Sequence, residues 1–528
     1  MNGSRSDTNA AISTQPLDAV SITALAYLLL PTLVFFNGWL KPGYAVAGIA
    51  LLIAQLRFSV HWAGVRWRPA LPPRYLALIV ALAAAWAIFG GAGHFFHANA
   101  DWQVRDGVYG DLIRGGWPVS YAIEDGTHRI LRSAIGYFLP PAALSKLLGL
   151  GVADLLLWIW TVIGAALFLL LLPIPWRTTP RVVTLLLVAI LFSGMDAIGV
   201  LLTTGYWPIF PIRIEWWVPL SYTSLTGQLY WAPNHALPLW ITTALFFRHW
   251  RHQDFPSFAL PMLLGALIWT PFSVLGLAPF LVLLVVNQLR AKTLGRDIVV
   301  QLALTAILAY PVARYLTLDI SQLAPTATFG TLPGGNAPPP PLREFLLHAY
   351  APFVLMEFGI LALLLHGHLR HSVHLFWIAV AVLASLPFLD VGPSTDTLLR
   401  VSTPALIILL ILTLLALQEP WLSWKDSRIA LVVVLMLGAV TPVHEIWRAA
   451  TWRHTPPNYA SCNLVERLSG AMPAHYIGKL LAPDLQALLR QPQLSPAGSP
   501  VLPSAPCPLV DRARPPSAPR NERTRSPD

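Results

Sequence analysis

The apolar stretch YLALIVALAAAWAIFGGAG (residues 75–93) runs directly into the polar stretch HFFHANADWQVRDGVYGDLIRGGWPVSYAIEDGTHRILRSAIGYF (residues 94–138). The first stretch has the length of a membrane-spanning helix, about 20 residues. The second gathers acidic and basic side chains in a chain of which only 11% of the residues are charged. Polar groups concentrated at the mouth of a membrane bundle predict a site that works at the membrane surface.

The composition of the whole chain agrees with a membrane protein. Hydrophobic residues make up 55% of the 528 residues, and the mean hydropathy is +0.59. Such values are typical of integral membrane proteins. The polar N-terminus lacks the short apolar core and small-residue cleavage site of a secretory signal, so we expect the first span to direct insertion.

The apolar stretches predict an all-α, polytopic bundle of about 13 transmembrane helices. The predicted spans cover residues 21–40, 43–60, 75–93, 152–174, 181–203, 233–247, 257–270, 272–289, 298–316, 351–366, 374–389, 402–418 and 428–443. This divides the chain into an N-terminal tail (1–20), a transmembrane domain (21–443) and a C-terminal tail (444–528).

Arginine and lysine residues fall on alternate loops, which predicts the orientation. The basic side, taken as the cytoplasm, carries Arg57, Arg66, Arg68, Arg74, Arg177, Arg181, Arg248, Arg251, Arg290, Lys292, Arg296, Arg370, Lys425 and Arg428. The opposite side carries the loops 94–151, 204–232, 317–350 and 390–401. An odd number of spans then places the N-terminus in the cytoplasm and the C-terminus outside.

The C-terminal tail ends in a Pro-, Ser- and Arg-rich run from residue 495 onward, which we expect to be disordered. Both cysteines of the chain, Cys462 and Cys507, lie in this tail. On an oxidising side of the membrane they would form a disulfide, and two unrelated thiols are the alternative.

The net charge of +10 suits anionic lipid headgroups. We expect no nucleic-acid partner, because no basic stripe is interleaved with aromatic residues. The chain also lacks a Walker loop, a dinucleotide fingerprint, an HExxH motif and paired CxxC motifs.

Three aspartates follow the third span at intervals of five residues: Asp101, Asp106 and Asp111. Five residues turn through about 500° on a helix, so the three would not share one face. The segment VRDGVYGDLIRG predicts a short amphipathic helix, on which Asp111 and Arg114 are spaced for an ion pair. Asp101 should lie nearest the membrane, beside two histidines. Solvated loop charges are the alternative for all three.

Further along the same loop, His128, Arg129 and Arg132 are candidates for binding a phosphate or pyrophosphate group. Interaction of the arginines with lipid headgroups explains them equally well. The apolar stretch 135–151 that follows is short and contains prolines, so we expect a re-entrant or interfacial helix.

The loop 204–232 is rich in tryptophan and tyrosine, more than interfacial anchoring requires. Glu215 is its only acid, and Asn234 with His235 opens the next span. Arg400 lies just inside another apolar run and needs a partner there, either Asp396 or a lipid phosphate. These four residues, Glu215, Asn234, His235 and Arg400, complete the predicted substrate-binding set.

Two acids lie within predicted spans, Asp196 and Glu357. Carboxyl groups inside a membrane are functional candidates by default, and they favour a transporter. The alternative is that each pairs with a neighbouring helix, for example through Arg314.

The chain resembles the GT-C class of membrane glycosyltransferases in its layout: multiple spans, a large first outer loop with an acid just after a helix, a partly amphipathic segment in that loop, and aromatic-rich later loops. More narrowly, three stretches resemble a group of bacterial membrane proteins that share this layout: DWQVRDGVYGDLIRGGWPVSY (101–121), LRSAIGYFLPPAALSKLLG (131–149) and YWAPNHALPLW (230–240). The resemblance covers roughly residues 75–405. It implies an inner (plasma) membrane protein with a periplasmic C-terminus.

The resemblance also implies a reaction. A sugar would move from a polyprenyl-phosphate donor to an envelope acceptor on the outer face, and Asp101 would occupy the position of the catalytic general base. Arg129, Arg132 or Arg400 would neutralise the leaving phosphate. No cofactor is expected, and a divalent metal at Asp101 is left open.

Two other classes of function compete with this reading. A transporter or flippase for a lipid-linked saccharide would use polar residues at the membrane midplane and would show internal repeats. The two acids within spans fit this class, but no internal repeat is evident, and most polar residues lie at the outer edge. A non-catalytic envelope assembly protein would need none of the acids of the outer loop. The sequence does not indicate an oligomeric state.

Overall fold

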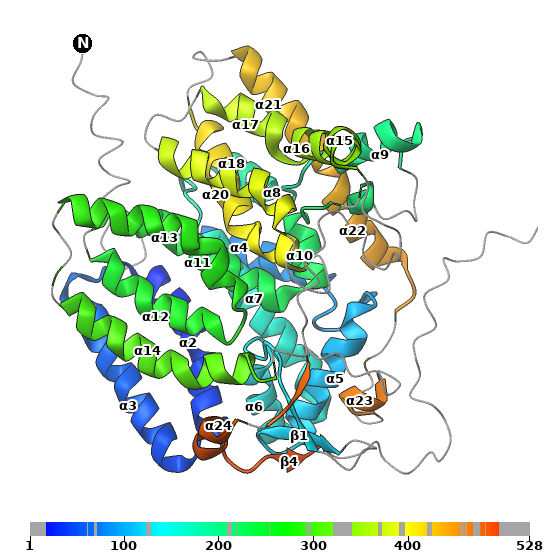
Figure 1. Cartoon of the computed structure of the whole chain (residues 1–528). Helices are drawn as coiled ribbons and strands as arrows, with labels where there is room; N and C mark the ends of the chain where they lie inside the picture. Colours follow the sequence, from blue (N-terminus) through cyan, green and yellow to red (C-terminus); the bar gives the residue numbers. More distant parts are fainter. Residues whose placement is uncertain are drawn as a thin grey trace, which may run out of the picture.

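Long helices packed side by side make up most of this protein, as its computed structural model shows (Figure 1). The structure describes residues 17–60, 62–67, 71–122, 128–208, 214–218, 220–252, 254–291, 295, 297–319, 341–367, 372–389, 396–419, 425–454, 457, 459, 462–467, 476–480 and 482–495.

Within these residues, eight helical stretches are long and apolar enough to cross a membrane. They are Ala19–Trp39, Pro42–Ser59, Leu150–Leu171, Phe272–Arg290, Asp297–Leu316, Leu342–His366, Thr397–Ala416 and Ser427–Thr451. They contain α2 (Ala19–Trp39), α3 (Pro42–Ser59), α7 (Ala153–Leu171), α13 (Phe272–Ala291), α14 (Asp297–Leu316), α20 (Thr403–Ala416), α21 (Lys425–Gly438) and α22 (Val440–Thr451). The prediction of a polytopic helical membrane protein is therefore confirmed, with eight such stretches.

Shorter apolar helices lie where other spans are predicted. They are α4 (Pro73–Ala87), α8 (Thr179–Ile190), α11 (Pro233–His249), α12 (Phe255–Leu267) and α18 (Val373–Ser385) with the 3₁₀ turn η7 (Leu386–Phe388). The total of about 13 spans stays a prediction, because these helices are shorter than a bilayer-crossing helix of about 20 residues.

The helix that covers Leu342–His366 is unusual in its backbone. It consists of α15 (Leu342–Glu344), the π-helical η5 (Phe345–Tyr350), α16 (Ala351–Val354), the π-helical η6 (Leu355–Gly359) and α17 (Ile360–His366). π-helical turns are rare and often accompany functional sites.

Local sequence signals explain where several helices begin. Asp18 caps α2, because its side chain accepts a hydrogen bond from the Ser21 amide at 2.9 Å. Pro42 and Pro73 stand at the first positions of α3 and α4, where the missing amide hydrogen costs nothing.

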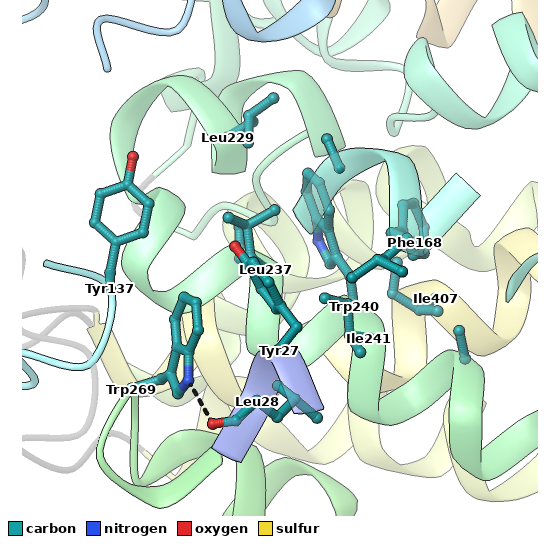
Figure 2. Close-up of a cluster of buried hydrophobic side chains, with 14 of the residues drawn as sticks. Tyr27, Leu28, Tyr137, Phe168, Leu229, Leu237, Trp240, Ile241, Trp269 and Ile407 are labelled. Atoms are coloured by element: carbon teal, nitrogen blue, oxygen red, sulfur yellow. Dashed lines mark hydrogen bonds between the residues drawn. The ribbon is translucent and has the colours of Figure 1, made fainter. Parts of the chain in front are cut away.

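Large aromatic residues fill the centre of the bundle (Figure 2). Tyr27, Trp240 and Trp269 are almost completely buried there, and the indole of Trp269 donates to the Leu28 carbonyl at 3.0 Å. Donation to a backbone carbonyl lets the indole be buried without leaving its N–H group unsatisfied.

The loop after α4 folds into a small mixed domain. It contains α5 (Asp101–Arg114), the strands β1 (Val119–Ala122) and β2 (His128–Leu131), α6 (Leu139–Leu148) and the 3₁₀ turn η2 (Leu150–Val152). The helix predicted from VRDGVYGDLIRG and the short helix within 135–151 are both present. The β-hairpin adds strands to a fold that the sequence predicts as all-α.

The C-terminal chain completes this domain. Strand β3 (Ile477–Lys479) pairs with β2, and β4 (Gln493–Leu494) pairs with β1, giving a sheet of order β3-β2-β1-β4. The helices α23 (Leu464–Arg467) and α24 (Pro483–Leu488) lie beside it (Figure 1). We call residues 94–148 together with the described residues of 462–495 the sheet assembly.

The two ends of α2 identify the two faces of the bundle. At its start, Asp18 pairs with Arg248 and bridges to Arg66, which are residues of the predicted cytoplasmic loops. At its end, Leu40 bridges to Leu489 of the sheet assembly. The described residues of 94–148 and of 462–495 therefore share the face opposite the basic loops.

The remaining elements are short: η1 (Trp62–Gly64), α9 (Asp196–Thr204), η3 (Ile214–Trp216), α10 (Leu225–Trp231) and α19 (Asp396–Val401). The last of the eight long helical stretches, Ser427–Thr451, runs past the end predicted for the last span, residue 443. Cys462 takes part in a disulfide, while its predicted partner Cys507 and the predicted disordered run from residue 496 onward lie outside the described residues.

Candidate functional site

The three aspartates of the first loop all lie on α5, but in different environments. Asp101 is the first residue of the helix, and its side chain is 46% exposed. It pairs with Arg105 one turn later at 3.2 Å. Asp101 is thus the one of the three aspartates that solvent or a substrate can reach.

Asp106 belongs to a buried clasp around His94. The His94 ring meets Asp106 through Nε2 at 3.1 Å and Asp154 through Nδ1 at 2.9 Å. Tyr459 donates to the same Asp154 oxygen at 2.6 Å. Burial alone would lower the pKa of His94, but the two carboxylates outweigh it and raise the pKa to about 10. The ring is therefore a cation that joins α5 to α7.

Asp111 joins the loop to the C-terminal chain. It is fully buried and accepts hydrogen bonds from Arg114 at 3.1 Å, Tyr121 at 2.8 Å, the Leu464 amide at 2.8 Å and the Ser495 hydroxyl at 3.1 Å. Burial raises its pKa to about 6 despite these donors. The predicted pair with Arg114 is confirmed, and the geometry is that of a structural hub.

A polar cavity lies close to Asp101, between the end of α4, the chain before α5, the end of α10 and α22. It has about 210 Å³ of empty space and is lined by Phe89, Gly90, His97, Asn99, Tyr230, Glu445, Arg448 and Ala449. The Asn99 side chain donates to the Tyr230 carbonyl at 2.8 Å and accepts from the Asp101 amide at 3.1 Å. Asp101 is thus tied to one wall of the cavity.

The cavity has groups suited to hydroxyl and phosphate ligands. The Tyr230 hydroxyl is buried and has no hydrogen-bond partner among the described residues. His97 Nδ1 lies 3.0 Å from the Arg453 carbonyl, which can only accept, so Nδ1 carries the proton and Nε2 presents a lone pair. Burial lowers the pKa of His97, and the nearby Arg448 lowers it further, which keeps the ring neutral.

Glu445 and Arg448 form the opposite wall on α22. They pair at 2.5 Å, the Trp231 indole donates to Glu445 at 2.9 Å, and the Arg448 guanidinium lies 4.9 Å from the Trp231 ring centre. Sequence reasoning assigns both residues to the tail and misses them. The available signal is their spacing of three residues directly after an apolar run.

The basic residues of the hairpin lie elsewhere. His128 and Arg129 are on β2, where Arg129 is opposite Tyr121 and Lys479. Arg132 is buried and donates to the Leu316 carbonyl at 3.1 Å. His128 and Arg129 are part of the sheet, Arg132 directly follows β2, and the cavity lining includes none of the three.

The predicted residues of the later loops are also dispersed. Glu215 is buried in η3 and accepts from the Ser224 amide at 3.1 Å and hydroxyl at 2.7 Å, and burial raises its pKa to about 8, with Glu445 and Asp196 contributing. His235 pairs with Thr270 at 2.8 Å.

Asn234 begins α11 beside His235 and is 9% exposed, as is Arg400 on α19. The side chain of Asp396, the predicted partner of Arg400, lies outside the described residues. The residues that line the cavity beside Asp101 do not include His235 or Arg400.

The two acids predicted to lie within spans are in contact with each other. Arg314, named from the sequence as an example of a partner, pairs with another residue. Asp196 and Glu357 are hydrogen-bonded together, whereas Arg314 pairs with Asp484 at 2.7 Å. Within the described ranges, no group of three or more His, Cys, Asp or Glu residues could hold a metal ion. Comparison with protein-family models, curated proteins and solved structures found no match to this chain.

Proposed function

We propose that this protein is a membrane glycosyltransferase that moves a sugar from a polyprenyl-phosphate donor to an envelope acceptor at the outer face of a bacterial inner membrane. The N-terminus would be cytoplasmic and the sheet assembly periplasmic. The observation that carries the proposal is the polar cavity, with an accessible carboxylate, Asp101, tied to its wall through Asn99.

The proposed chemistry needs a base near the acceptor. The acceptor hydroxyl attacks the anomeric carbon, Asp101 takes up the hydroxyl proton, and the bond from that carbon to the phosphate oxygen breaks. The neutral ring of His97 accepts a hydrogen bond from a sugar or acceptor hydroxyl through Nε2 and so orients it.

The leaving phosphate needs a positive partner. Arg448 lines the cavity, whereas Arg129 is in the sheet and Arg132 is buried against the Leu316 carbonyl, so we assign this role to Arg448. Exchange of its contact with Glu445 for a phosphate oxygen would supply a charge-assisted hydrogen bond to the leaving group.

A complementation experiment tests the proposal. Cells that lack the gene should accumulate a polyprenyl-phosphate sugar and lose a surface glycan, and the wild-type gene should restore both. Asp101→Asn, expressed at equal level, should fail to restore them, while Asp484→Asn should succeed. Restoration by Asp101→Asn would contradict the assignment.

The second candidate is a transporter of a lipid-linked saccharide, favoured by the contact between Asp196 and Glu357 within the bundle. In the same experiment, loss of function in Asp196→Asn or Glu357→Gln together with full function in Asp101→Asn would favour transport over transfer.

A further inference from the structure

Three segments that each depart from regular α-helical structure lie together at one place in the bundle. The chain between α8 and α9 is not helical around Ser193 and Gly194, Glu357 lies in the π-helical η6, and α21 gives way to α22 at Ala439. The segments are in contact, since the Met195 amide donates to the Met356 carbonyl at 2.9 Å.

The contact with the third segment is close. A Cβ atom on Gly438 would lie 2.5 Å from the Ser193 carbonyl oxygen, so only glycine fits there without a shift. Interrupted helices inside membranes are tolerated where they line a cavity or a binding site, because their free backbone groups need partners.

Two carboxyl groups come together at this place. Asp196 is fully buried and Glu357 is 4% exposed, and the two side chains are hydrogen-bonded to each other. Asp196 also accepts from Thr441 at 2.9 Å, Ser193 at 3.3 Å and Trp217 at 3.3 Å. Two carboxylates can only accept, so a hydrogen bond between them requires a proton on one.

Among the described residues, the titratable groups that act on the pair are acids and a tyrosine. The titratable groups around the pair are Glu215 and Tyr222, and within the described part of the chain no ion pair joins Asp196 or Glu357 to a basic residue. Arg448, on the helix that supplies Thr441, is paired with Glu445. Two bare negative charges in such a place would be very costly.

A cavity and a carboxyl oxygen with no hydrogen-bond partner among the described residues lie next to Asp196 and Glu357. A cavity with about 290 Å³ of empty space is lined by Phe192, Ser193, Gly194, Tyr222, Thr223, Leu225, Glu357, Leu361, Leu406 and Leu409. Glu357 Oε1 is buried and has no hydrogen-bond partner among the described residues. The pair therefore has room for proton exchange and an oxygen ready to receive a proton.

We propose that Asp196 and Glu357 form an intramembrane binding site for one proton, which is shared between the two carboxyl groups and exchanged through the cavity beside Glu357. The site is separate from the Asp101 cavity and does not depend on the proposed sugar transfer.

Labelling with dicyclohexylcarbodiimide tests the site in the full-length protein in detergent micelles. This apolar reagent takes up the proton of a carboxylic acid, and the resulting carboxylate oxygen adds to its central carbon, so the intact reagent is added. Peptide mass spectrometry at neutral pH should show about tenfold or more modification of Glu357 relative to Glu344, an exposed acid on the same helix.

Three arms make the result decisive. Modification of Glu357 should fall as the pH is raised, and Glu357→Gln should lose the label. Replacing choline chloride by sodium chloride at equal concentration should leave the label unchanged. Equal labelling of Glu357 and Glu344, or protection of Glu357 by sodium, would overturn the assignment of a proton site.

Discussion

The acidic side chains of the sheet assembly and those of the pair Asp196 and Glu357 have different kinds of partner. In the sheet assembly, Asp106 meets the His94 cation and Asp111 accepts four hydrogen bonds. In the bundle, Asp196 and Glu357 meet each other. In the first arrangement a cation or hydrogen-bond donors from distant segments face each acid and hold those segments together, whereas in the second each acid faces another acid.

Asp101 fits neither arrangement. It is half-exposed and has one basic partner, Arg105, while the two acids after it on α5 are buried. The comparison therefore separates three environments of carboxyl groups: buried and bonded to cations or donors for Asp106 and Asp111, buried against another acid for the membrane pair, and half-exposed for Asp101. We propose that the second environment binds a proton and that the third serves sugar transfer.

The largest expected effect is on the rate of transfer. Asp101→Asn should lower the rate of sugar transfer by about two to four orders of magnitude, because the amide cannot accept the hydroxyl proton. The protein should stay folded, because Asp101 is half-exposed and the asparagine oxygen can still accept a hydrogen bond from Arg105. A rate assay with purified protein and a calorimetric or fluorescence melt check both statements, and an unchanged rate would remove Asp101 from the catalytic role.

The next largest effect is on the integrity of the sheet assembly. Asp111→Ala should destabilise the assembly by about 3 kcal/mol, because it leaves the Arg114 guanidinium and the Tyr121 hydroxyl buried without this acceptor. Limited proteolysis should then release the chain after Thr451 faster than in wild type. Asp101→Asn is the control on the same helix, and equal protection of both variants would show that Asp111 is not a hub.

A smaller effect is expected from pH. The folded protein raises the pKa of His94 from 6.5 to about 10, so the clasp contributes its full stability below about pH 6.5 and loses it as the pH rises through 10. Melting temperatures at pH 7 and above pH 10 should differ more in wild type than in His94→Gln, whose amide does not titrate. An equal difference in both would contradict a charged His94.

The smallest effect concerns the contact between α24 and α14. Arg314 and Tyr310 hold Asp484 at 2.7 and 2.6 Å, and the ion pair with Arg314 keeps the pKa of this acid well below its usual range. The group is at the surface, where solvent screens such pairs. Asp484→Asn should therefore leave the proteolytic protection of residues 476–495 unchanged. Faster cleavage there would show that ion pairs, and not the strands, attach the C-terminal chain.

Local patterns in the sequence were sufficient for part of this description. The apolar runs predict the long helices, because burial in lipid requires continuous apolar stretches whose backbone bonds are internal. The spacing of Asp111 and Arg114 predicts their ion pair, and the position of Asp101 after an apolar run predicts its place at the edge of the bundle. Each of these signals lies within about 20 residues of chain.

The sequence did not predict the strands, the cavity or the partners of the acids that are distant in the chain. The Leu464 amide that binds Asp111 is 353 residues away, and the Tyr459 that meets Asp154 is 305 residues away. Hydrophobic periodicity does not encode such pairings, since any polar segment on the same face satisfies it equally well. Packing of the whole chain selects among them.

By itself the sequence determined that this is a helical membrane protein with a polar loop at one face, because hydropathy and local spacing act over short distances. Only the tertiary structure decided which acids are buried, which are exposed and which lie against each other. Those outcomes depend on burial and on donors brought from distant segments, such as the Thr441 hydroxyl at Asp196 and the Ser495 hydroxyl at Asp111.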